Sequence, residues 1–222
     1  MGLQLGLLAA LTLPQIVIVT FFNRRNIKNT GKNKGSNNTA SAAQALLFGI
    51  LTTIICPPVL YQQYSLGGAN TVETDLIMHL AVSFFLAHIA FVVVSKRVSS
   101  ELIHHLICLV TLLYSLVTQT FGQDLVLTIF LGEITFVLYI KIIAKNFKNI
   151  ELEKLCETIF VFMLVPLRLI IFPLYLYFFV SSPNAELLPS LLALAYVLLG
   201  FHFSRVVVQK WKANGTRKVS VA

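Results

Sequence analysis

Two adjacent histidines, His104 and His105, stand in an otherwise apolar stretch with the sequence ELIHHLICLVTLLYS, residues 101–115. The unperturbed pKa of an imidazole is about 6.5, so a histidine can take up and release a proton near neutral pH. One chemistry open to this pair is general base catalysis, in which an imidazole deprotonates a lipid amine or hydroxyl that then accepts an acyl group. Histidines within a membrane helix can also hold neighbouring helices together through hydrogen bonds.

The polar residues of this stretch fall on one face of a helix. Relative to His104, the angles are about 40° for Cys108, about −20° for Thr111, about 20° for Ser115 and about −40° for Thr118. Lipid penalises exposed polar groups, so we expect the stripe to face protein or a water-filled interior. Such residues also favour close helix packing, which would explain the same stripe without chemistry. The second histidine of the pair lies about 100° around the helix, where it can reach a neighbouring helix.

Other ionisable residues lie within apolar blocks. An isolated carboxylate near the middle of a span is costly to desolvate, so we expect Glu133 to be protonated or paired, with Arg168 or a histidine as its partner. His79 and His88 are nine residues apart, on opposite faces of a helix, so they cannot both line one cavity. His79 and His202 are interpreted mostly as structural.

These residues define a predicted site inside a helical bundle. The predicted lining of its cavity is His88, His104, Cys108, Thr111, Ser115, Glu133 and Arg168. The candidates for catalysis are His104, His105 and Glu133. The cysteines Cys56, Cys108 and Cys156 have neither the close spacing of a zinc site nor the even number that suggests a disulfide framework, so they are interpreted as small core residues. No metal and no cofactor are predicted.

The composition indicates the elements that must position these residues. Of the 222 residues 57% are hydrophobic and 12% charged, and the mean hydropathy is +0.82, which is typical of an integral membrane protein. The apolar residues fall in blocks long enough to cross a bilayer as helices. We therefore predict an all-α polytopic membrane protein with seven spans, near 3–22, 43–61, 75–95, 101–119, 124–143, 157–180 and 187–209.

The basic residues indicate an orientation. With the amino terminus lumenal or extracellular, all but three of the 17 lysines and arginines fall in cytosolic loops, and the carboxyl terminus is cytosolic. The formal charge of +8 is then an orientation signal and a contact to anionic lipid head groups. No binding module accompanies the charge, so a nucleic-acid partner is not expected.

The chain divides into four predicted parts. These are an amino-terminal transmembrane helix (1–22), a basic cytosolic linker (23–42), a six-helix domain (43–209) and a cytosolic tail (210–222). The first span is interpreted as a retained signal anchor, and the Asn- and Lys-rich linker as flexible. Prolines within several spans predict kinked helices around an internal cavity, although packing alone would also explain them.

Four landmarks resemble the TLC-domain family, which includes ceramide synthases, the translocating-chain-associated membrane protein and non-synthase proteins linked to lipid composition. The first is SAAQALLFG from Ser41, with Gln44 where the family has histidine. The second is SFFLAH, with His88 in place of an aspartate. The third is the paired histidines followed by Ser115, and the fourth is FVFMLVPLRLIIFP, with Phe162 and Arg168 ahead of Pro173. The resemblance covers roughly residues 40–212.

The resemblance implies a six-helix bundle, an endoplasmic reticulum or other endomembrane location and a role in membrane lipids. Ceramide synthases carry a His-Asp pair and a second aspartate after the paired histidines, thought to act in acyl transfer. Those positions here fall on Leu131, Gly132 and Thr135. Glu133 is similar to the glutamate of non-synthase members, which favours that group.

Three functions are open at this stage. The first is handling or homeostasis of phospholipids or sphingolipids without catalysis, with membrane lipids and acyl-CoA as partners. The second is acyl transfer from acyl-CoA with a histidine as base, and the third is an accessory role in a larger membrane complex. Matched inverted halves, which would indicate a transporter, are not evident.

Overall fold

The chain is described by a computed structural model over residues 36–94, 100–183 and 185–219. Within these ranges the regular elements are helices, with one isolated β-bridge between Ala69 and Thr120. They are α2 (Ser36–Gln63), α3 (Val72–Val94), α4 (Ser100–Thr118), α5 (Gly122–Glu133), α6 (Val137–Asn146), α7 (Ile150–Pro166), the π-helix η1 (Leu167–Ile171), α8 (Phe172–Val180) and α9 (Leu187–Val219).

The helices confirm an all-α, multi-pass membrane protein. Five segments are long and apolar enough to cross a membrane, and a shorter apolar helix accompanies them over Leu102–Thr118. The five segments are Ala42–Gln62, Val72–Ala90, Gly122–Lys145, Ile150–Val180 and Leu187–Lys212. The span predicted at 157–180 thus belongs to a longer helical run, and the span predicted at 3–22 lies outside the described residues.

The boundaries of the predicted parts shift at both ends of the bundle. Helix α2 begins at Ser36, so residues 36–42 of the predicted linker are helical. The rest of that linker lies outside the described residues. Helix α9 continues to Val219, so most of the predicted tail at 210–222 extends the last helix.

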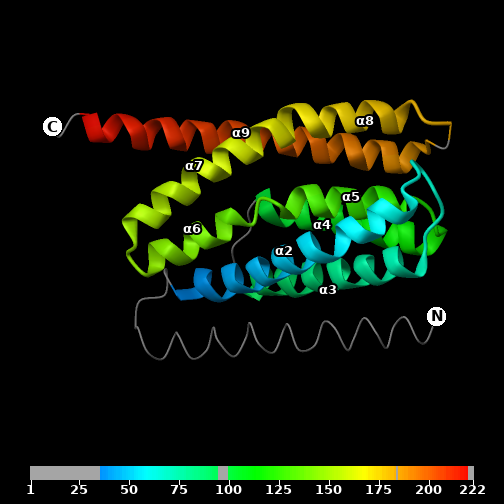
Figure 1. Ribbon diagram of the computed structural model, residues 1–222, viewed down its shortest axis with the longest axis horizontal. Coiled ribbons are helices and arrows are strands. Elements are labelled where there is room, and N and C mark those ends of the chain that lie inside the picture. The colour runs from blue at the N-terminus through cyan, green and yellow to red at the C-terminus, as the bar shows by residue number, and fades with distance from the viewer. Residues whose placement is uncertain (1–35, 95–99, 184, 220–222) are drawn as a thin grey trace.

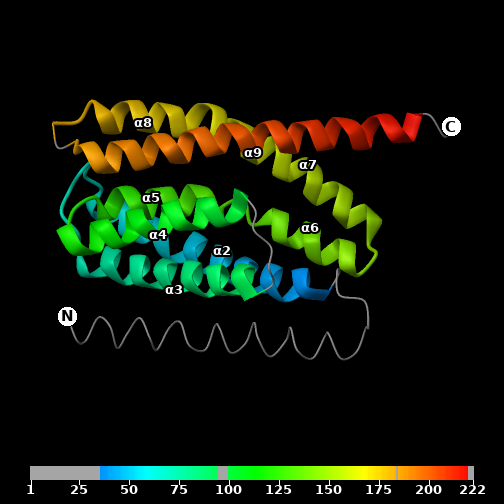
Figure 2. The same ribbon diagram turned by 180° about the vertical axis from the view of Figure 1, so that it is seen from behind.

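The helices form two groups that enclose the site between them. Figures 1 and 2 show α8 and α9 side by side, apart from the group formed by α2, α3, α4 and α5. Helix α4 packs on α3 and also on α9, and α6 packs on both α2 and α7. Helix α7 in turn packs on α9. The α4–α9 and α6–α7 contacts therefore join α8 and α9 to the group formed by α2, α3, α4 and α5.

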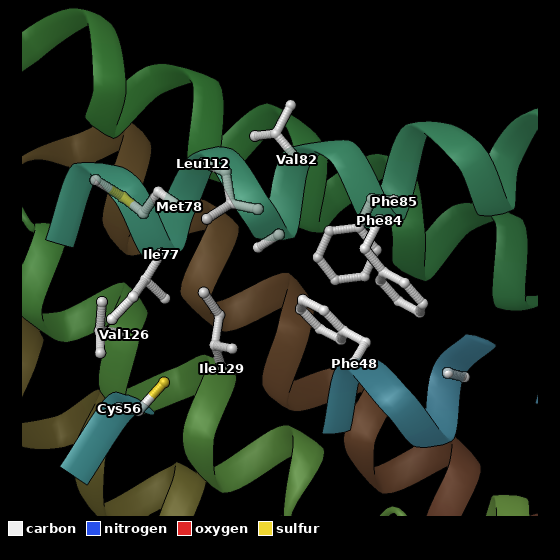
Figure 3. Close-up of a cluster of buried hydrophobic side chains, with 12 residues drawn as sticks. Phe48, Cys56, Ile77, Met78, Val82, Phe84, Phe85, Leu112, Val126 and Ile129 are labelled. Carbon is white, nitrogen blue, oxygen red and sulfur yellow. The ribbon is translucent and has the colours of Figure 1, made fainter. Parts of the chain in front are cut away.

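The larger cluster of buried hydrophobic side chains lies between α2, α3, α4 and α5 (Figure 3). The Phe48 and Phe84 rings stack with centroids 4.2 Å apart, and Phe85 meets both rings edge-on. Because lipid tails are as apolar as these side chains, close packing is what holds the helices together in a membrane. Gly49 contributes to that packing, because a Cβ atom there would lie 2.8 Å from the Cβ of Phe136.

Two helical runs are broken near the middle of the bundle. Helix α5 ends at Glu133, and a turn over residues 134–136 leads into α6. The run from α7 to α8 widens into the π-helix η1, where the Phe172 N–H donates to the carbonyl of Leu167. Pro166 and Pro173 flank this π-helix, and a proline has no N–H to donate, which favours a change in the hydrogen-bond pattern.

Candidate functional site

A cavity of about 310 Å³ lies between the two groups of helices. Its walls come from α4 and α5 on one side and from α7, η1, α8 and α9 on the other. Apolar side chains form most of the lining, among them Leu112, Ile129, Leu164, Leu176, Leu192 and Val197. Several polar groups interrupt this lining, among them Arg168 on η1 and Asp124 at the start of α5; the part of the cavity near Asp124 is here called the Asp124 end.

The polar stripe of α4 lines this cavity. His104, Cys108, Thr111 and Ser115 all contribute to the lining, as the helical angles predict. The Thr111 hydroxyl donates to the Ile107 carbonyl at 2.7 Å, so this group is satisfied within its own helix. Thr118, at the edge of the predicted stripe, is exposed and does not line the cavity.

The imidazole of His104 lies among aromatic rings from α9. Its centroid is 5.4 Å from that of Tyr196 and 6.1 Å from that of Phe203. The Cys108 sulfur is 3.8 Å from Nε2 and 3.9 Å from Nδ1 of His104. The i, i+4 spacing therefore places an imidazole and a thiol side by side on the cavity wall.

The other histidine of the pair turns away from the cavity. The buried ring of His105 lies 4.6 Å from the ring of His88 on α3 and 5.2 Å from that of Phe85. The prediction that His88 lines the cavity is wrong, because His88 packs between Phe84 and His105. The α3 residue that reaches the cavity is Phe85. His105 and His88 thus join α3 to α4.

The two remaining histidines also lie off the cavity. His79 is buried, and its Nδ1 is 2.6 Å from the carbonyl oxygen of Asp75 one turn earlier. His202 is exposed on α9. Both positions agree with the structural interpretation, and neither residue contributes to the lining.

Arg168 projects into the cavity from η1. Its guanidinium carbon lies 4.7 Å from the centroid of the Tyr196 ring and 5.0 Å from that of Phe172. Both distances are within the range of cation–π attraction. Gly200 of α9 makes room for the arginine, because a Cβ atom there would lie 3.1 Å from the Cδ of Arg168. The position of this cation therefore depends on η1 and on a glycine of the facing helix.

The Glu133 carboxyl group lies at the break between α5 and α6. Its Oε2 is 3.5 Å from the place that a Cβ of Gly49 would take, so one oxygen lies against α2. Its charge interacts with that of Arg168. In the described part of the chain, however, no ion pair or hydrogen bond joins Glu133 to Arg168 or to a histidine. Lys141 and Glu157 do form an ion pair there, at 2.9 Å.

The Asp124 end is closed by a network of hydrogen bonds. Asp124 is 2% exposed and accepts from the Tyr175 hydroxyl at 2.6 Å, the Gly67 N–H at 2.8 Å and the Tyr64 hydroxyl at 3.5 Å. This carboxylate therefore ties α8 and the α2–α3 connection to the start of α5. Tyr64 lies outside the spans and is 44% exposed; the partial burial of its hydroxyl, followed by the nearby charge of Asp124, raises its pKa to about 12.

A second network at this end holds the two connections together. The Asn70 side-chain oxygen accepts from the Gly122 N–H at 2.8 Å, and its amide donates to the Ser115 carbonyl at 3.0 Å. The Ser115 hydroxyl donates to the Thr120 carbonyl. Ser115 is thus both a lining residue and part of the α4–α5 connection.

Among the polar lining residues that were not predicted from the sequence are Tyr196, Tyr175 and Asp124. Asp124 stands in the first turn of a helix, where acidic residues are common, so its position in the sequence gives no sign of a site. The two tyrosines stand in runs of apolar residues that give no sign of which face they occupy. Their place in the lining depends on how α8 and α9 pack, which the sequence alone does not show.

Comparisons of the chain with protein-family models, with curated protein sequences and with solved structures give no match.

Proposed function

We propose that the chain binds an acyl chain of a membrane lipid in the cavity, and that it acts in membrane lipid handling or homeostasis without catalysis. The observation that carries this proposal is a cavity of about 310 Å³ with a mostly apolar lining and a few converging polar groups. Small-molecule sites have this character and volumes of roughly 300–1,000 Å³. The resemblance to non-synthase TLC-domain proteins supports the same class of function.

The setting of the site is part of the same proposal. We propose a seven-span bundle in an endomembrane, with the carboxyl terminus cytosolic and the basic loops on anionic lipid head groups. The excess of lysine and arginine in those loops supports this orientation. A glycosylation acceptor engineered into the α8–α9 connection, which this orientation places outside the cytosol, tests it.

Filling the cavity should weaken lipid binding. Ala193 lines the cavity from α9, so Ala193→Phe puts a ring where the acyl chain would lie. Each displaced CH₂ group is worth about 0.8 kcal/mol, so two or more should weaken binding by roughly tenfold or more. The measurement is native mass spectrometry of lipid that co-purifies with the full chain, followed by titration of the delipidated protein with a fluorescent acyl probe.

The neighbouring position supplies the control. Leu194 is 43% exposed on the outside of α9, so Leu194→Phe adds a similar ring without entering the cavity. This variant should keep the co-purified lipid and the affinity of the unchanged chain. Equal binding by the Ala193→Phe and Leu194→Phe variants would contradict the proposed site.

Acyl transfer is the second candidate function, and the position of His104 favours it. This imidazole lines the cavity, whereas His105 packs on α3. If a histidine is the general base, His104→Ala should lower turnover of labelled acyl-CoA by about 100-fold or more, and His105→Ala should leave most of it. Full turnover in the His104→Ala variant, or none in the unchanged chain, would reject this function.

A further inference from the structure

We propose that Arg168 binds the carboxylate of a single-chain fatty acid whose hydrocarbon tail occupies the cavity toward the Asp124 end. This inference rests on the proposed function, because it requires that the cavity accept an acyl chain. It adds the chemical class of the ligand and the residue that recognises its head group.

The first argument is the charge of Arg168. The residue lies within the candidate membrane span Ile150–Val180, and a guanidinium stays protonated in proteins. Charged groups inside a membrane are costly and normally pair with one another. In the described ranges no aspartate or glutamate forms an ion pair with Arg168. A ligand carboxylate would supply a counter-charge in direct contact with the guanidinium, which Glu133 does not.

The second argument is the set of groups around the guanidinium. Tyr196 and Phe172 present ring faces to it, and Tyr196 also offers its hydroxyl. Ring faces attract a cation but do not accept the N–H groups that project from the edge of its plane. A guanidinium has five such donors. The Tyr196 hydroxyl can accept from one of these donors, and in the described ranges no carboxylate pairs with the others.

The third argument is that the arginine is held in place before a ligand arrives. Its backbone belongs to η1, its stem fits against Gly200, and two rings flank its head. A side chain already fixed in its binding conformation loses little entropy on binding. The fork of N–H donors on such a guanidinium matches the two oxygens of a carboxylate.

The fourth argument is space. The volume of about 310 Å³ is near the lower limit for small-molecule sites, which favours one hydrocarbon chain over the two chains of a phospholipid. From Arg168 to Phe179 the lining follows η1 and then α8 over eleven residue steps, or roughly 16 Å at about 1.5 Å per residue. Leu176, Leu192 and Phe179 lie along this path and are apolar.

Glu133 is the acidic residue that could oppose this ligand, since it also lines the cavity. One of its carboxyl oxygens lies against Gly49 of α2 and not in an ion pair with Arg168. The ligand carboxylate would therefore compete only with the Tyr196 hydroxyl for the five guanidinium N–H donors. Glu133→Gln removes the opposing charge, so this variant should bind a fatty acid at least as tightly as the unchanged chain does.

The test compares two probes that differ only in the head group. Oleate and oleyl alcohol are titrated into the delipidated full chain in a neutral detergent. The unchanged chain should bind oleate about 10- to 100-fold more tightly, as expected for charge-assisted hydrogen bonds. Arg168→Gln should remove this preference and leave the affinity for oleyl alcohol unchanged. Arg205→Gln, on an exposed position of α9, should change neither affinity.

The outcomes separate this inference from the proposed function. If neither probe binds the unchanged chain, the proposed function itself fails. If both bind equally, or if Arg168→Gln weakens both equally, the cavity holds an acyl chain but Arg168 does not recognise a carboxylate. Tighter binding of lysophosphatidate than of oleate, lost in Arg168→Gln, would overturn the choice of a carboxylate in favour of a phosphate.

If circular dichroism shows that the Arg168→Gln variant does not fold, a second variant tests the inference. Gly200→Leu retains the arginine but places a side chain where the Cδ of Arg168 now lies. It should shift the guanidinium and lower the preference for oleate over oleyl alcohol. An unchanged preference in this variant would contradict the inference.

Discussion

Replacing Phe84 by alanine should lower the free energy of unfolding by about 2–3 kcal/mol. Phe84 is one of the largest fully buried side chains, and its ring stacks on Phe48 with planes only 2° apart. In a membrane the unfolded helices still lie in lipid, so the loss comes from the unfilled space and the missing van der Waals contacts. The measurement is reversible unfolding in mixed detergent micelles, followed by circular dichroism.

Phe162→Ala is the matched control for this prediction. Its ring is 69% exposed on the outer surface of α7, so its removal should change the free energy of unfolding by less than about 0.5 kcal/mol. Equal losses in the two variants would show that the core between α2 and α3 does not pack as described. Because α4 packs on α3, that result would also mean that this core does not hold the lining residues of α4 in place.

The second large effect is expected at the Asp124 end. Asp124→Ala leaves the Tyr175 hydroxyl and the Gly67 N–H without their acceptor, and this should lower the free energy of unfolding by about 2–3 kcal/mol. Asp124→Asn keeps one acceptor oxygen and should lose about half as much. Unfolding of Asp124→Ala, Tyr175→Phe and the double variant should give a non-additive cycle, because the two groups share one hydrogen bond. Additive losses would contradict that bond.

Tyr64 reports on the same network without unfolding the protein. Its pKa is raised to about 12, so the folded state stabilises the neutral phenol; this contribution is full below pH of about 10 and is lost as the pH rises through about 12. Burial is the larger cause and the charge of Asp124 the second. Ultraviolet absorbance of tyrosinate should therefore show a lower pKa for Tyr64 in Asp124→Ala, still above its usual value.

Much of the fold follows from local patterns in the sequence. Apolar blocks of membrane length predict helices that span a bilayer, and the described segments agree for the spans near 43–61, 124–143 and 187–209. The π-helix at Leu167–Ile171 and the turn over residues 134–136 could not be predicted. Prolines mark a place where a helix can kink, but the form of the break depends on the helices packed around it.

The candidate site was predictable where a single helix determines it. The angles of His104, Cys108, Thr111 and Ser115 follow from the helical period alone, and these four residues share one cavity wall. His88 was misplaced because its direction depends on how α3 is rotated against α4, which the period does not determine. For the same reason the sequence could not show which neighbours surround Glu133 and Arg168.

The most direct measurement of the central claim, that the cavity between α4 and α9 holds an acyl chain, is photocrosslinking with a fatty acid that carries a diazirine in its tail. After irradiation of the full chain in lipid nanodiscs, peptide mass spectrometry locates the adducts. Adducts should form on the cavity residues of α4 and α9, such as Thr111, Leu112, Leu192 and Ala193, and should be lost in Ala193→Phe. Adducts confined to outward-facing residues such as Ile54 and Phe162 would contradict it.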